Sequence, residues 1–327
     1  MYLKFFLILS LGVFLNCFLA APLKKESKHW QPKMNPKKVF KDWNDVFKSA
    51  KPIQITALKN GDVYTGPSVL IDKENSNTPE KEKIDQWVPA MSYLVSHPSE
   101  GYFLFDTGVP TADKDGRCDF SLYGFIYKTA CKVEPATDIA SLLSKLAIQN
   151  SDLNFAIISH LHGDHLGGVR DLLKRGNLNV LISEDEKKSA SEAFRILHGY
   201  PMEPLSLNFN LLTLANADYV NMPKLGRVYD LFGDGSIWLI DASGHTNGEL
   251  AALVVSSKGS FLFTFDSSHL KAGFENNVVP GFTVDKTKAS NALSRMRNFV
   301  KEFPQVKVIY GHEPSQWSKD VIQPLTK

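Results

Sequence analysis

The chain has 327 residues, of which 43% are hydrophobic and 22% charged, and these proportions exclude a disordered or fibrous protein. Its 37 Lys and Arg residues nearly balance its 35 Asp and Glu residues, and a formal net charge of +2 gives no polybasic field for a nucleic-acid backbone. Three cysteines are too few for a disulfide scaffold, whereas nine histidines are enough for a metal site if they cluster.

Residues 1–20 are predicted to form a secretory signal peptide. Lys4 precedes an apolar run over residues 5–14, and small residues further on provide a cleavage site. Asn16 interrupts the run, which is too short to cross a membrane. We therefore expect a cleaved, secreted or periplasmic protein without a membrane span. The alternative is a lipoprotein anchored at Cys17.

Residues 21–51 are basic and are predicted to form a surface arm. The alternative is that aromatic side chains pack this arm onto the body; the candidates are Trp30, Phe40, Trp43 and Phe47. No linker rich in Gly, Ser or Pro divides the remainder, so residues 52–327 are predicted to be one domain.

Short apolar runs alternate with helical patterns in this domain. Strands are predicted at residues 91–95, 102–105, 155–158, 237–240, 251–255, 261–265 and 306–310. Helical spacing occurs at residues 139–146, 184–197 and 285–303. The charged run at residues 73–83 is predicted to be a surface loop. The alternation indicates a mixed α/β fold.

Cys118 and Cys131 remain as a pair once the signal peptide is removed. In an oxidising compartment we expect a disulfide bond between them. The alternative is two unrelated buried thiols.

The segment Ser159–Gly168 reads S-H-L-H-G-D-H-L-G-G and directly follows a predicted strand. Alternate side chains of extended backbone share a side, so His160 and His162 can face one metal ion. A turn at the following glycine lets Asp164 and His165 face a second ion. Because imidazole and carboxylate suit zinc and its neighbours, the segment predicts a metal site rather than an ordinary polar loop.

Three further predicted strands end in potential ligands. His245 follows the strand at residues 237–240, Asp266 and His269 follow the strand at 261–265, and His312 follows the last strand. One such histidine alone would more often be a hydrogen-bonded surface residue. Repetition at several strand ends favours ligands instead.

This order of residues resembles the ligand motif of the metallo-β-lactamase superfamily over residues 52–317. The resemblance implies a four-layer αββα sandwich with two divalent metal ions, zinc first among the candidates, at one edge. It assigns the first ion to His160, His162 and His245, the second to Asp164, His165 and His312, and the bridging carboxylate to Asp266. It also places Asp106 behind the ligand loop, where a ligating histidine needs an oriented acceptor.

Within the superfamily, the local strings are most similar to the N-acyl homoserine lactonases. They are Gly244-His245-Thr246-x-Gly248, Asp266-Ser267-Ser268 and Tyr310-Gly311-His312-Glu313. The best-known β-lactamases replace the bridging Asp by Cys, which argues against antibiotic hydrolysis. Two features depart from the lactonases: His269 stands where they usually carry Tyr, and they are mostly cytoplasmic, whereas this chain is predicted to begin with a signal peptide.

The resemblance implies a hydrolase that opens lactone rings with a metal-bridging hydroxide. Asp164 would pass a proton to the leaving oxygen, and His269 would hold the carbonyl oxygen. The alternatives are another ester, a thioester such as a hydroxyacylglutathione, a phosphodiester or a β-lactam, or a non-catalytic scaffold. A small-molecule substrate is expected, and no nucleic acid. The acyl chain of such a substrate needs an apolar pocket wall, for which the candidates are Trp87, Met91, Phe120, Tyr123, Phe125, Tyr127 and Phe282. Residues with this spacing are more often part of the hydrophobic core.

Overall fold

A computed structural model describes residues 25–31, 38–111, 129–193, 195–201 and 206–326. The predicted signal peptide, Cys17, Cys118 and the aromatic residues at 120–127 lie outside these ranges. Within them, no helix is both long and apolar enough to cross a membrane. Cys131 is disulfide-bonded.

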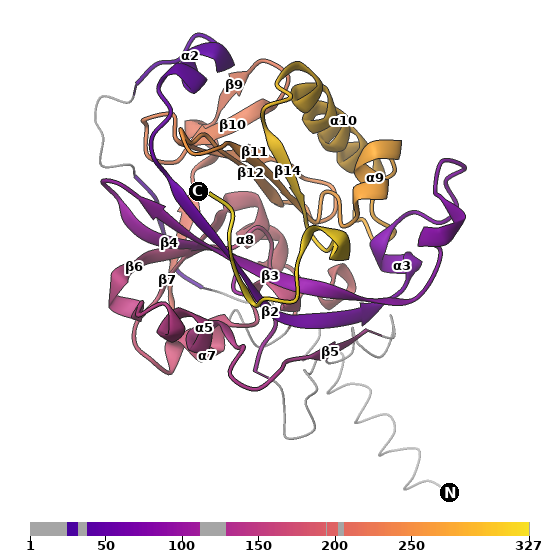
Figure 1. Ribbon diagram of the computed structural model, residues 1–327, viewed down its shortest axis with the longest axis horizontal. Coiled ribbons are helices and arrows are strands. Elements are labelled where there is room, and N and C mark those ends of the chain that lie inside the picture. Colours follow the sequence, from indigo (N-terminus) through magenta and orange to yellow (C-terminus); the bar gives the residue numbers. More distant parts are fainter. Residues whose placement is uncertain (1–24, 32–37, 112–128, 194, 202–205, 327) are drawn as a thin grey trace, which may run out of the picture.

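Two β-sheets pack face to face (Figure 1). The first follows the order β1-β8-β7-β6-β4-β3-β2-β15, and β5 also pairs with β2. Its strands are β1 (Ser27–His29), β2 (Gln54–Thr65), β3 (Gln86–His97), β4 (Gly101–Phe105), β5 (Ala130–Lys132), β6 (Leu153–Ile157), β7 (Asn179–Ser183), β8 (Asn210–Leu214) and β15 (Ile322–Pro324). The second sheet follows the order β14-β13-β12-β11-β10-β9. Its strands are β9 (Val220–Met222), β10 (Gly226–Asp230), β11 (Ile237–Asp241), β12 (Leu250–Val254), β13 (Phe261–Phe265) and β14 (Lys307–Tyr310).

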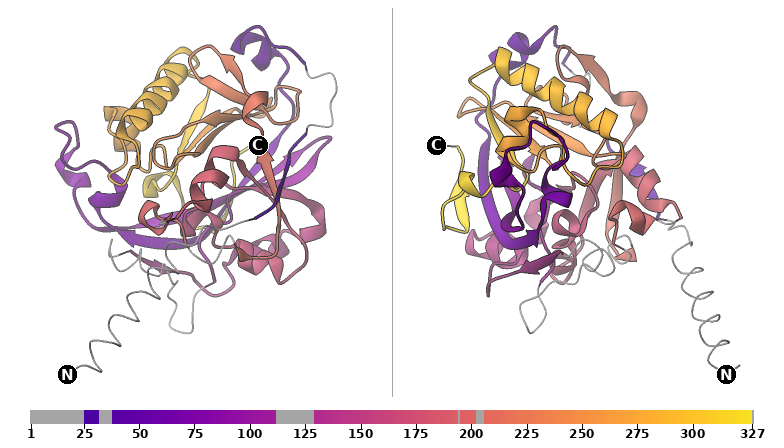
Figure 2. Two further views of the ribbon diagram at one scale, coloured as in Figure 1. Left: turned by 180° about the vertical axis from the view of Figure 1, so that it is seen from behind. Right: turned by 90° about the vertical axis from the view of Figure 1, so that its right-hand side faces the viewer.

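Helices cover the outer face of each sheet (Figures 1 and 2). The first sheet carries α5 (Ile139–Lys145), α6 (Gly163–Leu166), α7 (Val169–Leu173) and α8 (Glu184–Ser191). The second carries α2 (Trp43–Lys48), α9 (Lys271–Asn276) and α10 (Lys286–Glu302), while α3 (Pro67–Leu70) follows β2. Short 3₁₀ turns lie at Glu80–Glu82, Asn150–Asp152, Arg195–His198, Asn216–Asp218 and Pro314–Gln316. The predicted αββα sandwich is confirmed.

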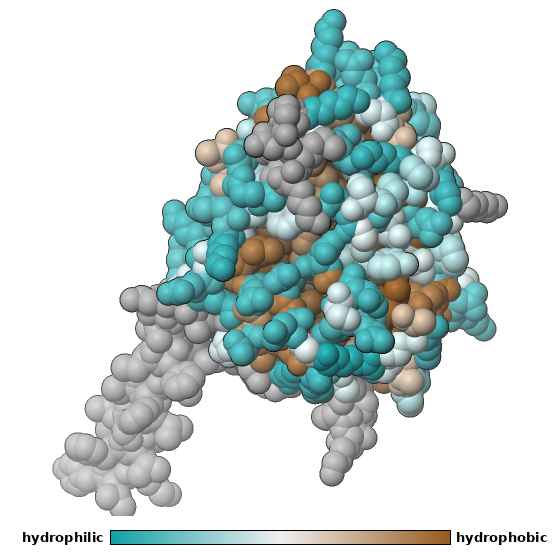
Figure 3. Space-filling view, turned by 90° about the vertical axis from the view of Figure 1, so that its left-hand side faces the viewer, coloured by the Kyte–Doolittle hydropathy of each residue, from teal (hydrophilic) through white to brown (hydrophobic). Residues whose placement is uncertain are grey.

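The apolar patterning explains these layers. One buried cluster, which includes Phe103, Phe155 and Phe263, fills the space between the sheets. Two others lie between each sheet and its helices. On the face shown in Figure 3, polar side chains surround separate apolar patches. Burial of apolar surface against both faces of each sheet therefore holds the four layers together.

Every predicted strand coincides with an observed one, and the helices predicted at residues 139–146 and 285–303 correspond to α5 and α10. The helical pattern at 184–197 extends too far: α8 ends at Ser191 because Glu192 adopts an extended conformation, with φ −72° and ψ 158°. Met91 is 5% exposed and belongs to the cluster between the sheets, so it is core rather than pocket wall.

The segment predicted as a basic arm packs on the body within the described residues. β1 pairs in parallel with β8, and Trp30 donates from Nε1 to the carbonyl oxygen of Leu231 at 3.0 Å. Trp43 in α2 is 1% exposed. The aromatic residues thus attach this segment, and the packed unit includes residues before position 52.

Candidate metal centre

The predicted ligands all lie in segments that follow the carboxyl ends of strands. His160 and His162 follow β6, and α6, which begins immediately afterwards at Gly163, carries Asp164 and His165. Further along the chain, the loops after β11, β13 and β14 carry His245, Asp266 and His312 in turn. Because β6, β11, β13 and β14 end at the same edge of the sandwich, their loops meet there.

We define the first ligand group as His160, His162, His245 and Asp266, and the second as Asp164, His165 and His312. Within each group, one potential ligand atom per residue lies within 4.8 Å of all the others. The first group joins the three histidines that the resemblance assigns to one ion with Asp266, its expected bridge, and the second group is the set that it assigns to the other ion. The structure brings the members of each group together.

Asp266 presents one carboxylate oxygen to each group. Its Oδ2 lies 3.5 Å from Nε2 of His160 and 3.4 Å from Nε2 of His245. Its Oδ1 lies 3.3 Å from Nε2 of His165 and 3.1 Å from Nε2 of His312. This arrangement fits a carboxylate shared between two cations.

The outer nitrogen of each ligand ring is held by an acceptor. Carbonyl oxygens of His198, Phe282 and Pro89 accept from His162 Nε2 at 2.9 Å, His245 Nδ1 at 2.8 Å and His312 Nδ1 at 2.9 Å, respectively. A neutral imidazole has one proton, so each inner nitrogen then carries a lone pair.

The inner nitrogens of the ligand rings converge on one another and on Asp266. The inner nitrogens of His162 and His245 lie 3.0 Å apart. Nε2 of His160, Nε2 of His165 and Oδ1 of Asp266 are buried without a hydrogen-bond partner among the described residues. Buried acceptors that face one another are unfavourable unless a cation lies between them, so the residues fit bound metal ions.

Asp106 supports the second group, as the resemblance implies. It directly follows β4 in a left-handed conformation with φ 53°. Its carboxylate accepts from Nδ1 of His165 at 2.8 Å and from the backbone and hydroxyl of Ser159 at 2.7 and 2.9 Å. The strained backbone thus aims one buried carboxylate at both the ligand ring and the ligand loop.

Electrostatics differ between the two groups. Burial lowers the pKa of His162 to about 4 and holds the pKa values of His160 and His245 well below 6.5, so these rings are neutral at neutral pH. For His165 and His312, burial also favours the neutral ring, but neighbouring carboxylates, above all Asp266, raise the pKa. A metal ion at the second group therefore competes with protons more strongly than a metal ion at the first group does.

His269 is also at the centre. It is 1% exposed, its Nδ1 donates to the carbonyl oxygen of Leu70 at 3.0 Å, and its Nε2 lies 2.9 Å from Oδ2 of Asp266. With Asp266 and His312 it forms a third set of potential ligands. Because Nδ1 holds one proton, Nε2 donates only in the imidazolium form, and in the neutral form it offers a lone pair that could bind a metal ion.

Glu186 is a site residue that the sequence did not indicate. This fully buried carboxylate in α8 accepts from the backbone N–H of Leu161 at 2.8 Å and from the Thr246 hydroxyl at 2.8 Å. It lies in an acidic run, Glu184-Asp185-Glu186, whose composition is typical of a solvated helix end. Nothing in that run distinguishes the buried member.

Of the possible pocket-wall residues, Phe282 lies at the site. Its ring centroid is 5.8 Å from that of His162 and 5.9 Å from that of His245. Trp87 is 48% exposed and packs on Tyr64, with ring centroids 5.3 Å apart.

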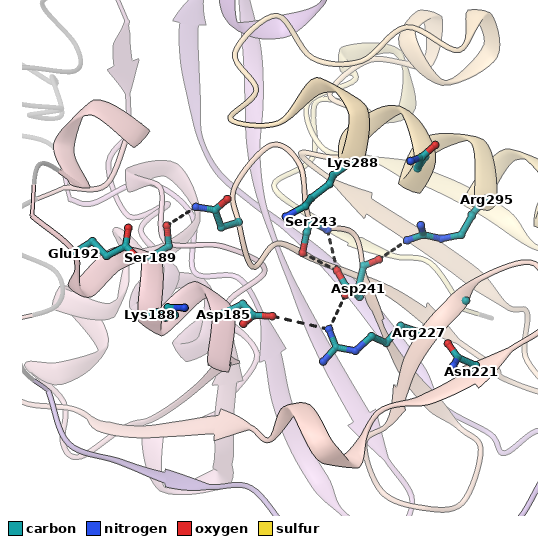
Figure 4. A pocket seen from close by; sticks show the side chains of 13 residues that line it. Asp185, Lys188, Ser189, Glu192, Asn221, Arg227, Asp241, Ser243, Lys288 and Arg295 are labelled. Carbon is teal, nitrogen blue, oxygen red and sulfur yellow. Dashed lines mark hydrogen bonds and ion pairs between the residues drawn. The ribbon is translucent and has the colours of Figure 1, made fainter.

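A polar groove of 610 Å³ lies behind the His245 loop (Figure 4). Lys188 of α8 faces it from one side, Lys288 and Arg295 of α10 from the other, and Asp241 and Ser243 lie between them. Its described lining contains none of the predicted ligands. The groove is thus separate from the metal centre.

Comparison with known proteins agrees with this geometry. The sequence profile of the Metallo-beta-lactamase superfamily matches residues 85–312. An N-acyl homoserine lactonase from Bacillus sp is 28% identical over 244 residues, covering 74% of this chain and 87% of that protein. The N-acyl homoserine lactonase AttM from Agrobacterium fabrum is 24% identical over 245 residues, covering 72% and 85%. The solved structure of a quorum-quenching N-acyl homoserine lactone hydrolase, 22% identical, has a TM-score of 0.62 and covers 83% of this chain and 96% of that one.

Proposed function

Because the chain belongs to the metallo-beta-lactamase superfamily, we propose that it is a dinuclear metal-dependent hydrolase that opens the ring of N-acyl homoserine lactones or related lactones. The observation that carries the proposal is the convergence of buried imidazole nitrogens on the Asp266 carboxylate, where Nε2 of His160, Nε2 of His165 and Oδ1 of Asp266 have no hydrogen-bond partner among the described residues. The relatives named lactonases indicate the substrate class.

The donor set suits two ions of the zinc type, since imidazole and carboxylate are the ligands that zinc and neighbouring metals accept. When bound, the ions supply a water nucleophile of lowered pKa at neutral pH and a Lewis acid for the substrate carbonyl. The chain's own residues hold the ligands in place, orient the substrate and move the proton.

Asp164 is suited to proton transfer. Its side chain is 18% exposed, whereas that of Asp266 is 4% exposed, so Asp164 is the more open to a substrate. One oxygen lies 3.5 Å from Nε2 of His312. We assign to this carboxylate the transfer of a proton to the leaving ring oxygen.

His269 and Phe282 are suited to substrate contacts. In its imidazolium form, His269 presents an N–H from Nε2 into the centre, where it stabilises negative charge that develops on the carbonyl oxygen. The Phe282 ring, beside His162 and His245, offers an apolar surface for the acyl chain.

A hydrolysis panel on the metal-loaded protein tests the proposal. It compares acyl homoserine lactones and simple lactones with a cephalosporin, a glutathione thioester and an aryl phosphodiester. We expect the highest kcat/KM for a lactone. Equal or faster turnover of another substrate would contradict the lactonase assignment, and the preferred substrate would then identify the reaction.

A further inference from the structure

Glu186 joins the two chain segments that carry the histidines of the first ligand group. Leu161, whose N–H donates to Oε1 of Glu186 at 2.8 Å, lies between His160 and His162. Oε2 accepts from the Thr246 hydroxyl at 2.8 Å, and Thr246 directly follows His245. The same oxygen accepts from the backbone N–H of Gly248 at 3.1 Å.

These segments come from different sheets. The loop after β6 belongs to the first sheet and the loop after β11 to the second, so the relative position of their histidines depends on contacts between the sheets. The Glu186 carboxylate is one such contact and is fully buried. A charged or strongly polar acceptor in a buried position holds its donors more firmly than an exposed one does.

Close packing of α8 against the His245 loop holds the backbone of Glu186 in place. A Cβ on Gly248 would lie only 2.0 Å from the backbone nitrogen of Glu186, so only glycine allows this approach of the loop to α8. Ser183, which caps α8, accepts from that same nitrogen at 3.0 Å and donates to the carbonyl oxygen of Gly248 at 2.6 Å. The N-terminus of α8 is therefore attached to the His245 loop through Ser183 as well as through Glu186.

We propose that Glu186 is the positioning residue of the first metal site, where it sets the separation of His160 and His162 from His245 without touching the metal. This inference rests on the proposed dinuclear function. The hydrogen bonds of Glu186 go to residues beside the first group, whereas Asp106 binds His165 of the second group directly. Loss of Glu186 should therefore weaken one site and spare the other.

The test is Glu186→Gln, read out by metal binding. Glutamine has one acceptor oxygen, and its NH₂ group would face either Leu161 N–H or the donors of Thr246 and Gly248. We expect metal affinity at the first site to fall about 10- to 100-fold, as for other groups that orient ligands. Thr246→Val removes one donor to Glu186 and should give a smaller loss of metal affinity, which provides a second variant if Glu186→Gln folds poorly.

Two variants, each with one metal site disrupted, show which site Glu186→Gln affects. In His312→Ala, where the intact first group holds the remaining ion, Glu186→Gln should lower Co²⁺ affinity and change the Co²⁺ absorption spectrum. In His245→Ala, where the second group holds it, the same change should have no effect. Glu192→Gln is the matched control: Glu192 caps the far end of α8, is exposed and lines the separate groove (Figure 4).

Equal losses in both backgrounds, or no loss in either, would overturn the inference. Saturating metal should restore most turnover to Glu186→Gln, because the groups assigned to the reaction are unchanged. A metal titration of the wild type distinguishes failure of the Glu186 inference from failure of the proposed dinuclear function. If it binds two ions but Glu186→Gln behaves like wild type, only the inference fails; if it binds fewer than two, the dinuclear function fails as well.

Discussion

His269 is the residue at which this chain departs from the lactonases it resembles. It points Nε2 at Asp266 and has its other nitrogen bound to Leu70. If it acts as a donor to substrate, His269→Ala should retain both metal ions and lose kcat by about 10²- to 10³-fold, the usual effect of removing one such donor. His269→Tyr should recover part of kcat, because a phenol also donates. Metal analysis beside steady-state kinetics checks both variants.

The result also distinguishes the two roles that the structure allows. Loss of one metal ion from His269→Ala, with no recovery in His269→Tyr, would contradict the donor role and make His269 a ligand.

At this scale, the sequence predicted the ligands and one of their supports, Asp106, but not the other groups that orient them. Ligands such as His160 and Asp266 directly follow apolar strands and have side chains with recognisable chemistry. The groups that orient them include the carbonyl oxygens of Leu70 and Phe282, which any residue supplies. Glu186 is a glutamate among other acidic residues, and only the packing of α8 against the loops makes it different.

Among the elements, the turn Arg195–His198 closes against the first ligand group. Gly199 follows it with φ 82°, and a Cβ there would lie 2.5 Å from Nε2 of His162. Gly199→Ala should therefore displace the His162 ring from the His198 carbonyl oxygen and lower metal affinity at the first site. Equilibrium dialysis against a chelator measures this effect.

Gly176→Ala is the control that distinguishes displacement of the His162 ring from strain of the backbone. Gly176 also has a positive φ, 138°, but a Cβ there would meet nothing within 4 Å. It should destabilise the fold by about 1 kcal/mol or more and leave metal affinity unchanged. Similar metal loss in both variants would show that the close approach to His162 is unimportant.

The loop between β10 and β11 gives the fold a pH dependence that is independent of metal. Burial, together with the charge of Asp234, raises the pKa of Asp230 to about 7 from 3.8, although the N–H groups of Gly233 and Gly235 favour the ionised form. The folded state thus binds this proton more tightly than the unfolded state, and its stability falls as pH rises from about 4 through about 7.

Asp230→Asn removes this titration. Asn keeps one acceptor and loses the other, so the variant should be less stable than wild type at low pH. As the pH rises from 5 to 8.5, the unfolding free energy of the wild type should fall relative to that of Asp230→Asn by on the order of 2–3 kcal/mol. Urea unfolding at several pH values measures it, and a constant difference would contradict the prediction.

The predicted elements were those with unbroken apolar runs, such as β12 and β13, which are buried throughout. β2 is not among the predicted strands, and its sequence contains Asn60-Gly61, a pair typical of a turn. In the structure, β2 continues through a bulge there, and buried Asn60 donates to the carbonyl oxygen of Thr107 at 3.0 Å. A hydrogen bond to a distant loop thus replaces the local turn that the sequence favours.

Across the whole molecule, the segment before residue 52 connects layers that are distant in sequence. β1 adds a strand beside β8 of the first sheet, while α2 packs on the outer face of the second. Trp30 lies between them, with its ring centroid 4.8 Å from that of Phe155 and its Nε1 bound to Leu231 beyond β10. The segment therefore contributes to the joint stability of both sheets and of the metal centre at their edge.

Trp43→Ala tests that contribution. The Trp43 ring centroid lies 5.2 Å from that of Trp238 and 5.3 Å from that of Phe299, and its Nε1 donates to the carbonyl oxygen of Pro223 at 2.6 Å. Truncation leaves a cavity and an unpaired carbonyl oxygen, so unfolding free energy should fall by about 3–5 kcal/mol. Val39→Ala, at a side chain 92% exposed, should change it by less than about 0.5 kcal/mol. Urea unfolding of the metal-loaded proteins measures both, and a loss below about 1 kcal/mol for Trp43→Ala would mean that α2 lies on a body that is stable without it.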